Sequence, residues 1–249
     1  MNIKNLIKKA VKRATISTYR IVKEQELKDR KTPLDFYIYE QAKESYEEFS
    51  LVMPKAMIFP ERKDMRIFVV REILELIKDQ DYDNKQLFLE FGVCSGNTIN
   101  HFAELIKGTR IEYIHGFDSF EGLEEDWTGM ERGRPLGSYS LQGQLPKVLE
   151  NVKLHKGWVQ DTLPEFLNNN SGSILFAHMD MDTYTPGVFT LNKIKERLVH
   201  GSLILFDDFY GFGGWRYHDY KALLEVFNDN EYEIIAFGKN QAIIRIIKD

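Results

Sequence analysis

The chain has 249 residues, of which 43% are hydrophobic and 13% aromatic, which suits one large α/β domain with an extension and a sizeable core. The formal net charge of −5 argues against a general nucleic-acid binder. The single cysteine excludes an internal disulfide, and without a signal-peptide pattern or an apolar run of membrane-spanning length we expect a cytoplasmic protein.

The first 30 residues are basic. They contain nine Lys and Arg against three Asp and Glu, about +6, which leaves about −11 for the remainder of the chain. Residues 3–23 have the spacing of an amphipathic helix, with one apolar stripe and lysines on the other faces. We expect this helix to pack against a second subunit in a homo-oligomer. Contact with a membrane surface is the less favoured alternative.

Two parts are predicted along the chain: a helical extension over residues 1–60 and a main domain over residues 61–249. Thr32 followed by Pro33 is typical of a helix start. The rest of the extension has the pattern of helical pieces and loop rather than sheet, and could cover a site as a lid. The main domain is expected to begin with a helix over residues 61–79.

From residue 87 onward, apolar strand patterns alternate with helical patterns. Seven strands are predicted, over residues 87–93, 111–118, 152–159, 174–181, 202–208, 232–238 and 241–247. Helices are predicted over residues 97–107, 143–151, 162–169, 185–199 and 218–229. This alternation predicts an α/β fold with a doubly wound, mostly parallel sheet. The last two strands are separated by too few residues for a crossover helix, so they should form a C-terminal antiparallel hairpin.

The segment from Leu87 to Asn97 is an apolar strand, then a turn containing Gly92 and Gly96, and then a helix start. Glycine lets the backbone approach a nucleotide-like ligand, and free N–H groups at the helix start meet its polar atoms. Glu90 lies within the strand, where a carboxylate is costly unless it has a task. The candidate ligand contacts here are Glu90, Gly92, Ser95, Gly96 and Asn97.

Polar residues also follow the second and third strands. Asp118, with Ser119 beside it, ends the second strand, where a carboxylate can accept hydrogen bonds from both ribose hydroxyls. A turn aspartate is the alternative. After the third strand, Gln160 or Asp161 could bind the edge of a base beside Trp158. Alternatively, Trp158 belongs to the core and Asp161 caps the next helix.

The fourth and fifth strands end in aspartates. Asp180 lies at the end of the fourth strand, and Asp207 and Asp208 at the end of the fifth. Neighbouring parallel strand ends lie about 5 Å apart, so these carboxylates should converge and raise one another's pKa unless a cation lies among them. An all-oxygen set suits Mg²⁺, with Mn²⁺ or Ca²⁺ as alternatives. The simpler alternative has Asp182 capping the following helix and Asp207 and Asp208 as polar loop residues.

Several strings of this sequence, taken together, resemble the macrocin O-methyltransferase family. They are Glu90-Phe-Gly-Val-Cys-Ser-Gly96, Phe117-Asp-Ser-Phe-Glu-Gly-Leu123, Gly157-Trp-Val-Gln-Asp-Thr-Leu-Pro164, Asp180-Met-Asp-Thr-Tyr184 and Phe206-Asp-Asp208. The similarity spans roughly residues 55–230. It implies a class I, Rossmann-like methyltransferase domain that uses S-adenosylmethionine and Mg²⁺ to methylate sugar hydroxyls on macrolides and related glycosides. It also implies donor contacts from Glu90, Gly92 and Gly96, a ribose contact from Asp118, and Gln160 and Asp161 near the adenine.

The same resemblance implies that the metal is held by Asp180, Asp207 and Asp208. Asp180 or Asp182 would lie near the acceptor hydroxyl as the general base. His178 could help to position an acceptor, although a buried core histidine is the favoured interpretation. The loop over residues 124–134 and the segment over residues 34–60 are the candidate walls of the acceptor site.

The leading hypothesis is therefore O-methyl transfer from S-adenosylmethionine to a small-molecule or glycan acceptor with hydroxyl groups. A nicotinamide-dependent oxidoreductase is less favoured, because the segment from Gly92 to Gly96 does not fit Gly-x-Gly-x-x-Gly and because the chain ends in a hairpin. A binding protein without turnover on the same fold is the third hypothesis.

Overall fold

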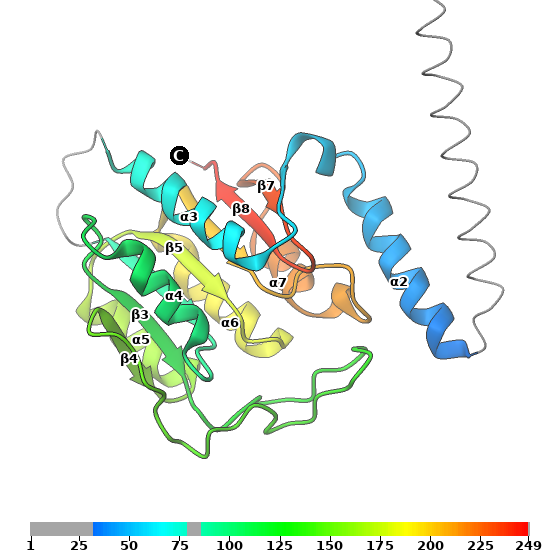
Figure 1. The fold of residues 1–249 in the computed structure, drawn as a ribbon, viewed down its shortest axis with the longest axis horizontal. Helices are drawn as coiled ribbons and strands as arrows, with labels where there is room; N and C mark the ends of the chain where they lie inside the picture. Colours follow the sequence, from blue (N-terminus) through cyan, green and yellow to red (C-terminus); the bar gives the residue numbers. More distant parts are fainter. Residues whose placement is uncertain (1–31, 79–85, 249) are drawn as a thin grey trace, which may run out of the picture.

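The computed structural model of the protein describes residues 32–78 and 86–248 (Figure 1). Within these residues the strands are β1 (Met57–Ile58), β2 (Leu87–Phe91), β3 (Ile114–Asp118), β4 (Val152–Lys156), β5 (Ile174–Met179), β6 (Leu198–Phe206), β7 (Tyr232–Phe237) and β8 (Ala242–Ile246). They form one sheet in the order β1-β7-β8-β6-β5-β2-β3-β4. The predicted helix over residues 3–23 lies outside the described residues.

The sheet is parallel except at β8, which pairs antiparallel with both β6 and β7. The turn between β7 and β8 is closed by a hydrogen bond from the Gly238 N–H to the Gln241 carbonyl. The predicted mostly parallel sheet with a C-terminal antiparallel hairpin is confirmed. β1 adds one strand to the predicted seven. It has only two residues, too few to show a period in the sequence, and it extends the edge beside β7.

Helices cover both faces of the sheet. They are α2 (Pro33–Phe49), α3 (Arg62–Leu76), α4 (Asn97–Ile106), α5 (Val159–Asn169), α6 (Tyr184–Ile194) and α7 (Asp219–Val226), with 3₁₀ turns η1 (Met53–Lys55), η2 (Lys195–Arg197) and η3 (Trp215–Tyr217). One core cluster joins the sheet to α3 and α4, and the other joins it to α5, α6 and α7. The doubly wound arrangement predicted from the alternation is confirmed. None of the helices in the described segments is long and apolar enough to cross a membrane.

The helix predicted over residues 143–151 is wrong, because this segment is loop. The Asn100 side chain of α4 donates to the Lys147 carbonyl at 3.0 Å and accepts from the Leu149 N–H at 2.9 Å. Backbone groups that a helix would use internally are thus bound by a neighbouring element, and Pro146 has no N–H to contribute. Residues 119–151 therefore connect β3 to β4 as one long loop, drawn in green in Figure 1.

Helix α5 begins three residues earlier than predicted, and β4 ends three residues earlier. Trp158 occupies the N-cap position, so the alternative in which Asp161 caps this helix is wrong. Trp158 is also 38% exposed, which removes the alternative that it belongs to the core. The boundary was misplaced because Trp158 and Val159 fit the apolar pattern of a strand, whereas in the structure they begin α5.

Helix α2 joins the C-terminal part of the domain through aromatic and charged contacts. Its start is as predicted, with the Thr32 side chain accepting a hydrogen bond from the Asp35 N–H. At its other end Phe49 is buried among the rings of Phe209, Tyr210, Trp215, Tyr220 and Phe237, with centroids 5.4–5.8 Å away. Arg216 pairs with carboxylates of the same helix at 2.5 and 2.8 Å. α2 therefore shares the core of the main domain.

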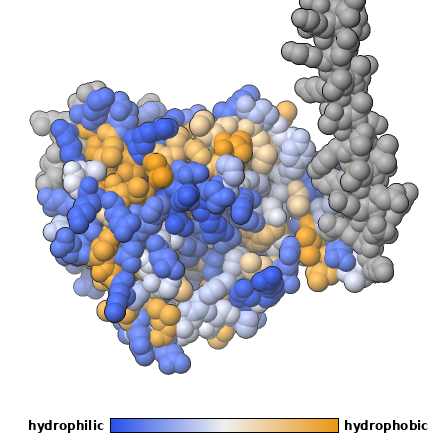
Figure 2. Space-filling view, viewed as in Figure 1, coloured by the Kyte–Doolittle hydropathy of each residue, from blue (hydrophilic) through white to orange (hydrophobic). Residues whose placement is uncertain are grey.

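The outer surface over α3 and α4 is mixed. Figure 2, drawn from the same side as Figure 1, shows hydrophilic side chains lying between separate hydrophobic groups. This is the surface expected where amphipathic helices turn one face to the sheet and the other to water.

Candidate functional site

A cavity of about 380 Å³ lies at the carboxyl ends of the parallel strands, a size typical of small-molecule sites. Residues that follow β2, β3, β5 and β6 form its floor, and these include Gly92, Cys94, Asp118, Ser119, Asp180, Asp182, Asp207 and Asp208. The β3–β4 loop adds a wall made by Leu123, Glu124, Trp127, Met130 and Tyr139. The predicted acceptor-wall segment, residues 124–134, therefore supplies three of the lining residues. No residue of the other predicted wall segment, residues 34–60, lines the cavity.

The glycine turn after β2 is packed directly against the chain after β5. Gly92 has a φ of +87°, and a Cβ at this position would lie 1.8 Å from the Asp180 carbonyl oxygen. Only glycine combines this backbone conformation with so close an approach. The turn and Asp180 are therefore fixed relative to each other.

Asp118 organises the same turn. Its Oδ2 accepts hydrogen bonds from the N–H groups of Val93 and Cys94 at 2.8 and 2.7 Å, and its Oδ1 accepts one from the Phe120 N–H at 2.6 Å. The two interpretations of this aspartate are compatible, because it holds two turns and also lines the cavity. Oδ2 already accepts two hydrogen bonds, whereas Oδ1 accepts one and can still accept another from a ligand hydroxyl.

Of the other candidates for ligand contact, only Ser119 lines the cavity. Ser119 lines the cavity beside Asp118, whereas Glu90 is fully buried beneath it. Three further candidates outside the lining are Ser95, Gly96 and Asn97, in the turn and at the start of α4. Gln160 donates to both carboxylate oxygens of Glu124, at 2.9 and 2.8 Å, and reaches the cavity only through that residue. Asp161 is exposed outside it.

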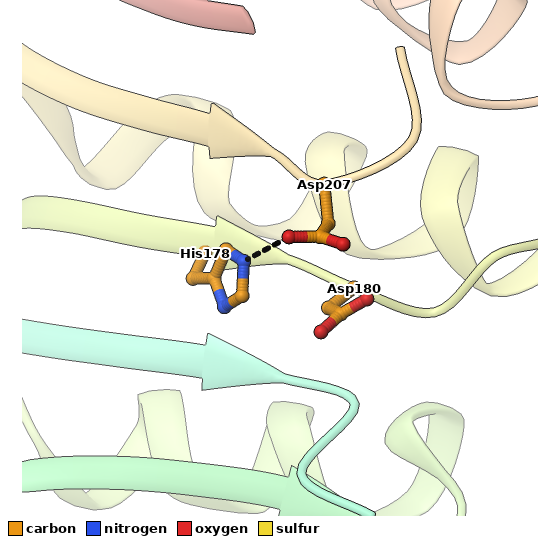
Figure 3. Close-up of side chains that lie close together, drawn as sticks. All are labelled: His178, Asp180 and Asp207. Carbon is orange, nitrogen blue, oxygen red and sulfur yellow. Dashed lines mark ion pairs between the residues drawn. The ribbon is translucent and has the colours of Figure 1, made fainter. Parts of the chain in front are cut away.

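Four aspartates meet at the ends of β5 and β6. Possible ligand atoms lie within 4.8 Å of one another in two overlapping sets, one of His178, Asp180 and Asp207 and one of Asp180, Asp182 and Asp208. Figure 3 shows the first set, with the His178 ring on β5 facing the Asp207 carboxylate that follows β6. The predicted convergence of Asp180, Asp207 and Asp208 is thus divided between two sets that share Asp180, and Asp182 joins them.

Burial and mutual repulsion disturb the protonation of this group. Burial, together with the charge of Asp207, raises the pKa of Asp180, and burial with the charge of Asp180 raises that of Asp182. Burial followed by the charge of Asp207 raises the pKa of Asp208 to about 6. Burial opposes the ionisation of Asp207, but the contacts with His178, Arg62 and Gln241 together outweigh it and lower the pKa to about 2. Such a group is stabilised by a cation.

Two features of the structure already offset this negative charge. Arg62, the first residue of α3, forms an ion pair with Asp207 and lines the cavity. A hydrogen bond between the side chains of Asp182 and Asp208 raises the pKa of the first and lowers that of the second. The close carboxylate oxygens and the need for positive charge fit a divalent cation of the Mg²⁺ type. The sequence analysis did not identify Arg62 as a site residue, because an arginine at the start of a helix gives no sign that it contacts the end of a distant strand.

Asp182 has a φ of +63°, an uncommon backbone conformation for a residue other than glycine. Strained backbone of this kind is concentrated at ligand sites. Here it follows β5 directly and places Asp182 among the cavity residues.

The cavity wall is held at several points. The Glu125 carboxylate accepts hydrogen bonds from the N–H and hydroxyl of Thr185 at the start of α6, at 2.8 and 2.7 Å. His218 Nε2 bonds the Thr128 carbonyl at 2.9 Å. A Cβ on Gly129 would lie 2.7 Å from the Gly214 Cα, so the loop is also packed closely on the segment before α7. The wall is therefore attached to the C-terminal half of the sheet.

Comparison with known proteins identifies the fold. Residues 89–209, just under half of the chain, match a family model described as a methyltransferase domain. The crystal structure of CalS11, a calicheamicin methyltransferase, aligns with a TM-score of 0.56 at 20% identity, covering 87% of this chain and 94% of that one. The apo structure of CalS11, described as a TDP-rhamnose 3′-O-methyltransferase of calicheamicin biosynthesis, aligns with a TM-score of 0.54 at 20% identity. This alignment covers 87% of this chain and 96% of that one.

The O-methyltransferase NovP aligns with a TM-score of 0.52 at 19% identity, covering 86% of this chain and 98% of that one. No curated protein matches the chain significantly. At these identities the likeness concerns the fold, and it agrees with the strand order and the closing hairpin. The chain has the methyltransferase fold.

Proposed function

We propose that this chain is an S-adenosylmethionine-dependent O-methyltransferase that uses a divalent cation, preferably Mg²⁺, to methylate a hydroxyl of a sugar, glycoside or related natural product. One observation carries the proposal: the glycine turn after β2 and the four-aspartate group share one cavity, joined where Gly92 meets the Asp180 carbonyl. The sugar acceptor is supported by the description of CalS11 as a TDP-rhamnose 3′-O-methyltransferase, and transfer to oxygen also by the description of NovP as an O-methyltransferase. The macrocin O-methyltransferase family remains our more specific assignment, supported by the five strings of the sequence.

In the proposed site the donor lies along the turn after β2, with Asp118 at its ribose. Methyl transfer is an in-line displacement at a sulfonium carbon, so the enzyme mainly aligns nucleophile, carbon and sulfur. The fixed distance between the Gly92 turn and Asp180 provides this alignment across the cavity. Trp127 and Trp158 enclose the cavity from the side of the β3–β4 loop and α5, and limit the access of water.

The cation would be held by Asp180, Asp207 and Asp208, with Asp182 close enough to contribute. A bound divalent cation lowers the pKa of a coordinated hydroxyl. Asp182 is our favoured general base, because it lines the cavity next to Asp180 and burial raises its pKa, which makes the carboxylate a stronger proton acceptor. His178 is fully buried, does not line the cavity and is the least suited of the three candidate bases.

The proposal is tested by calorimetry with S-adenosylmethionine, with and without Mg²⁺, and by release of S-adenosylhomocysteine in the presence of a panel of glycosides. We expect donor binding without metal and turnover only with it. Donor binding without turnover on any hydroxylated acceptor would favour a binding protein on the same fold. Absence of donor binding would refute the proposal.

Replacing Asp118 by alanine should weaken donor binding by about 1–3 kcal/mol, or roughly 5–150-fold. The substitution removes the proposed ribose acceptor and also leaves three turn N–H groups without their partner. Calorimetry measures the effect, with Asp229→Ala at an exposed position as the matched control. Unchanged affinity in a folded Asp118 variant would remove this residue from the donor site.

Cation binding should weaken as the pH falls through about 6. The pKa of Asp208 in the fold is about 6, above its ordinary value, so below that pH the carboxyl holds a proton that a cation must displace. Affinity should fall about tenfold for each pH unit below 6. Mn²⁺ titrations followed by electron paramagnetic resonance between pH 5 and 8 measure this directly. A constant affinity over that range would contradict the role of Asp208 as a ligand.

A further inference from the structure

Three buried ionisable side chains lie in a row across neighbouring strands. Glu90 of β2 and His178 of β5 are paired in the sheet register, and Asp207 directly follows β6. His178 Nδ1 lies 3.2 Å from Glu90 Oε2, and His178 Nε2 lies 3.5 Å from Asp207 Oδ1 (Figure 3). The side chains of Glu90 and His178 are 0% exposed and that of Asp207 is 4% exposed. The imidazole thus lies between two buried carboxylates: Nδ1 is hydrogen-bonded to Glu90, whereas Nε2 makes no hydrogen bond of its own and faces Asp207 at ion-pair distance.

Only one end of this row reaches the cavity. Asp207 lines it, whereas Glu90 and His178 do not. Asp207 Oδ1 also accepts a hydrogen bond from Gln241, and Oδ2 is in contact with Arg62. One oxygen of Asp207 is therefore held from the interior, and the other is paired with Arg62 at the cavity.

We propose that His178 is a positioning residue for the cation site: Glu90 fixes the imidazole through Nδ1, and Nε2 fixes the carboxylate of Asp207. The inference rests on the proposed function, in which Asp207 is a cation ligand. Loss of a group that orients a metal ligand from behind typically lowers metal affinity about 10–100-fold. The arrangement also explains Glu90, because a carboxylate buried in a strand is costly unless a partner satisfies it.

In this proposal the two ring nitrogens of His178 have different roles, and substitutions can remove these roles one at a time. An asparagine amide occupies roughly the position of Nδ1, so His178→Asn keeps a donor toward Glu90 and removes the donor toward Asp207. A glutamine amide reaches roughly the position of Nε2, so His178→Gln keeps a donor toward Asp207. Both variants are uncharged and of similar size, which makes each the control for the other.

The experiment is a Mn²⁺ titration of the full chain followed by electron paramagnetic resonance. We expect His178→Asn to bind Mn²⁺ about 10–100-fold more weakly than the wild type. His178→Gln should bind it nearly as well as the wild type, and both should retain affinity for S-adenosylmethionine. The same pair of substitutions at His115, on β3 beside His155, should leave Mn²⁺ affinity unchanged.

Equal Mn²⁺ affinity in the wild type, His178→Asn and His178→Gln would overturn the inference, because the position of Asp207 would then not depend on His178. Equal loss in both variants would also overturn it, since His178 would then act as a direct ligand or only by filling space. If the wild type binds donor but no Mn²⁺, the cation site fails and this role fails with it, while the donor half of the proposed function stands.

A second pair of variants addresses the case in which His178→Asn does not fold. Glu90→Gln keeps an acceptor for Nδ1–H, and Glu90→Met has similar length and no acceptor. We expect Mn²⁺ affinity to be retained in Glu90→Gln and lowered in Glu90→Met, because only the latter frees the imidazole. Thermal unfolding of each variant establishes that the folded protein is compared. Equal Mn²⁺ affinity in these two variants would overturn the role of Glu90.

Discussion

Replacing Asp180 by asparagine should lower methyl transfer by at least about 100-fold, the scale for removing one key electrostatic contact. Asp180 is the residue common to both sets of close ligand atoms, so its loss affects every arrangement of a cation there. Asparagine keeps the shape of the side chain and removes one charge. Donor affinity should change little, because Gly92 and Asp118 remain in place.

The rate is measured as release of S-adenosylhomocysteine at saturating donor, with Asp229→Asn as the control for the same change at an exposed position. Chelation of the wild-type enzyme by EDTA should produce a similar loss, and Mg²⁺ or Mn²⁺ should restore the rate. Full activity in EDTA would show that the aspartates do not form a required metal site. Asp182 would then have to act as a base without metal.

Replacing Gly92 by alanine should destabilise the protein by at least about 3 kcal/mol and abolish donor binding. The new Cβ would lie 1.8 Å from the Asp180 carbonyl oxygen, and the φ of +87° adds strain for any residue with a side chain. Because Asp180 belongs to the aspartate group, relief of this clash must move either the turn or the proposed cation site. The measurements are chemical denaturation and calorimetry with S-adenosylmethionine.

Gly108 provides a matched control. Its φ is +75°, close to that of Gly92, but a Cβ there would meet nothing within 4 Å. Gly108→Ala should therefore cost only the backbone strain, about 1 kcal/mol, and leave donor binding intact. Similar losses in the two variants would mean that the contact with Asp180 is unimportant and that backbone conformation alone is at work.

The sequence was most informative where a residue's neighbours follow from the strand pattern. The apolar strands alternate with helices, and this pattern alone places Asp118, Asp180 and Asp207 at one edge of the sheet. The antiparallel pairing of β7 and β8 followed from the shortness of their connection. Parallel strands bring their carboxyl ends together, and this single geometric rule predicted most of the cavity floor.

Contacts between distant segments were not predictable in this way. A single side chain of α4, Asn100, binds the backbone where a helix was expected, and no local pattern in residues 143–151 reveals this. Glu90 was predicted to face a ligand because a carboxylate in a strand needs a purpose. Its partner His178 lies on another strand, and only the register of the two shows that they meet. Arg62 reaches Asp207 across a still longer separation, 145 residues against 88.

No helix lies between β3 and β4, so this segment shapes the cavity while other segments supply the helix and sheet layers of the fold. Residues 119–151 shape the cavity without contributing a helix or strand to the sheet layers, and a few contacts such as Glu125 with Thr185 attach them. Changes between those attachment points can alter which acceptor fits while the donor turn and the aspartates stay where they are. We therefore expect changes within residues 130–139, away from these attachment points, to alter acceptor preference with the least effect on the donor turn and the aspartates.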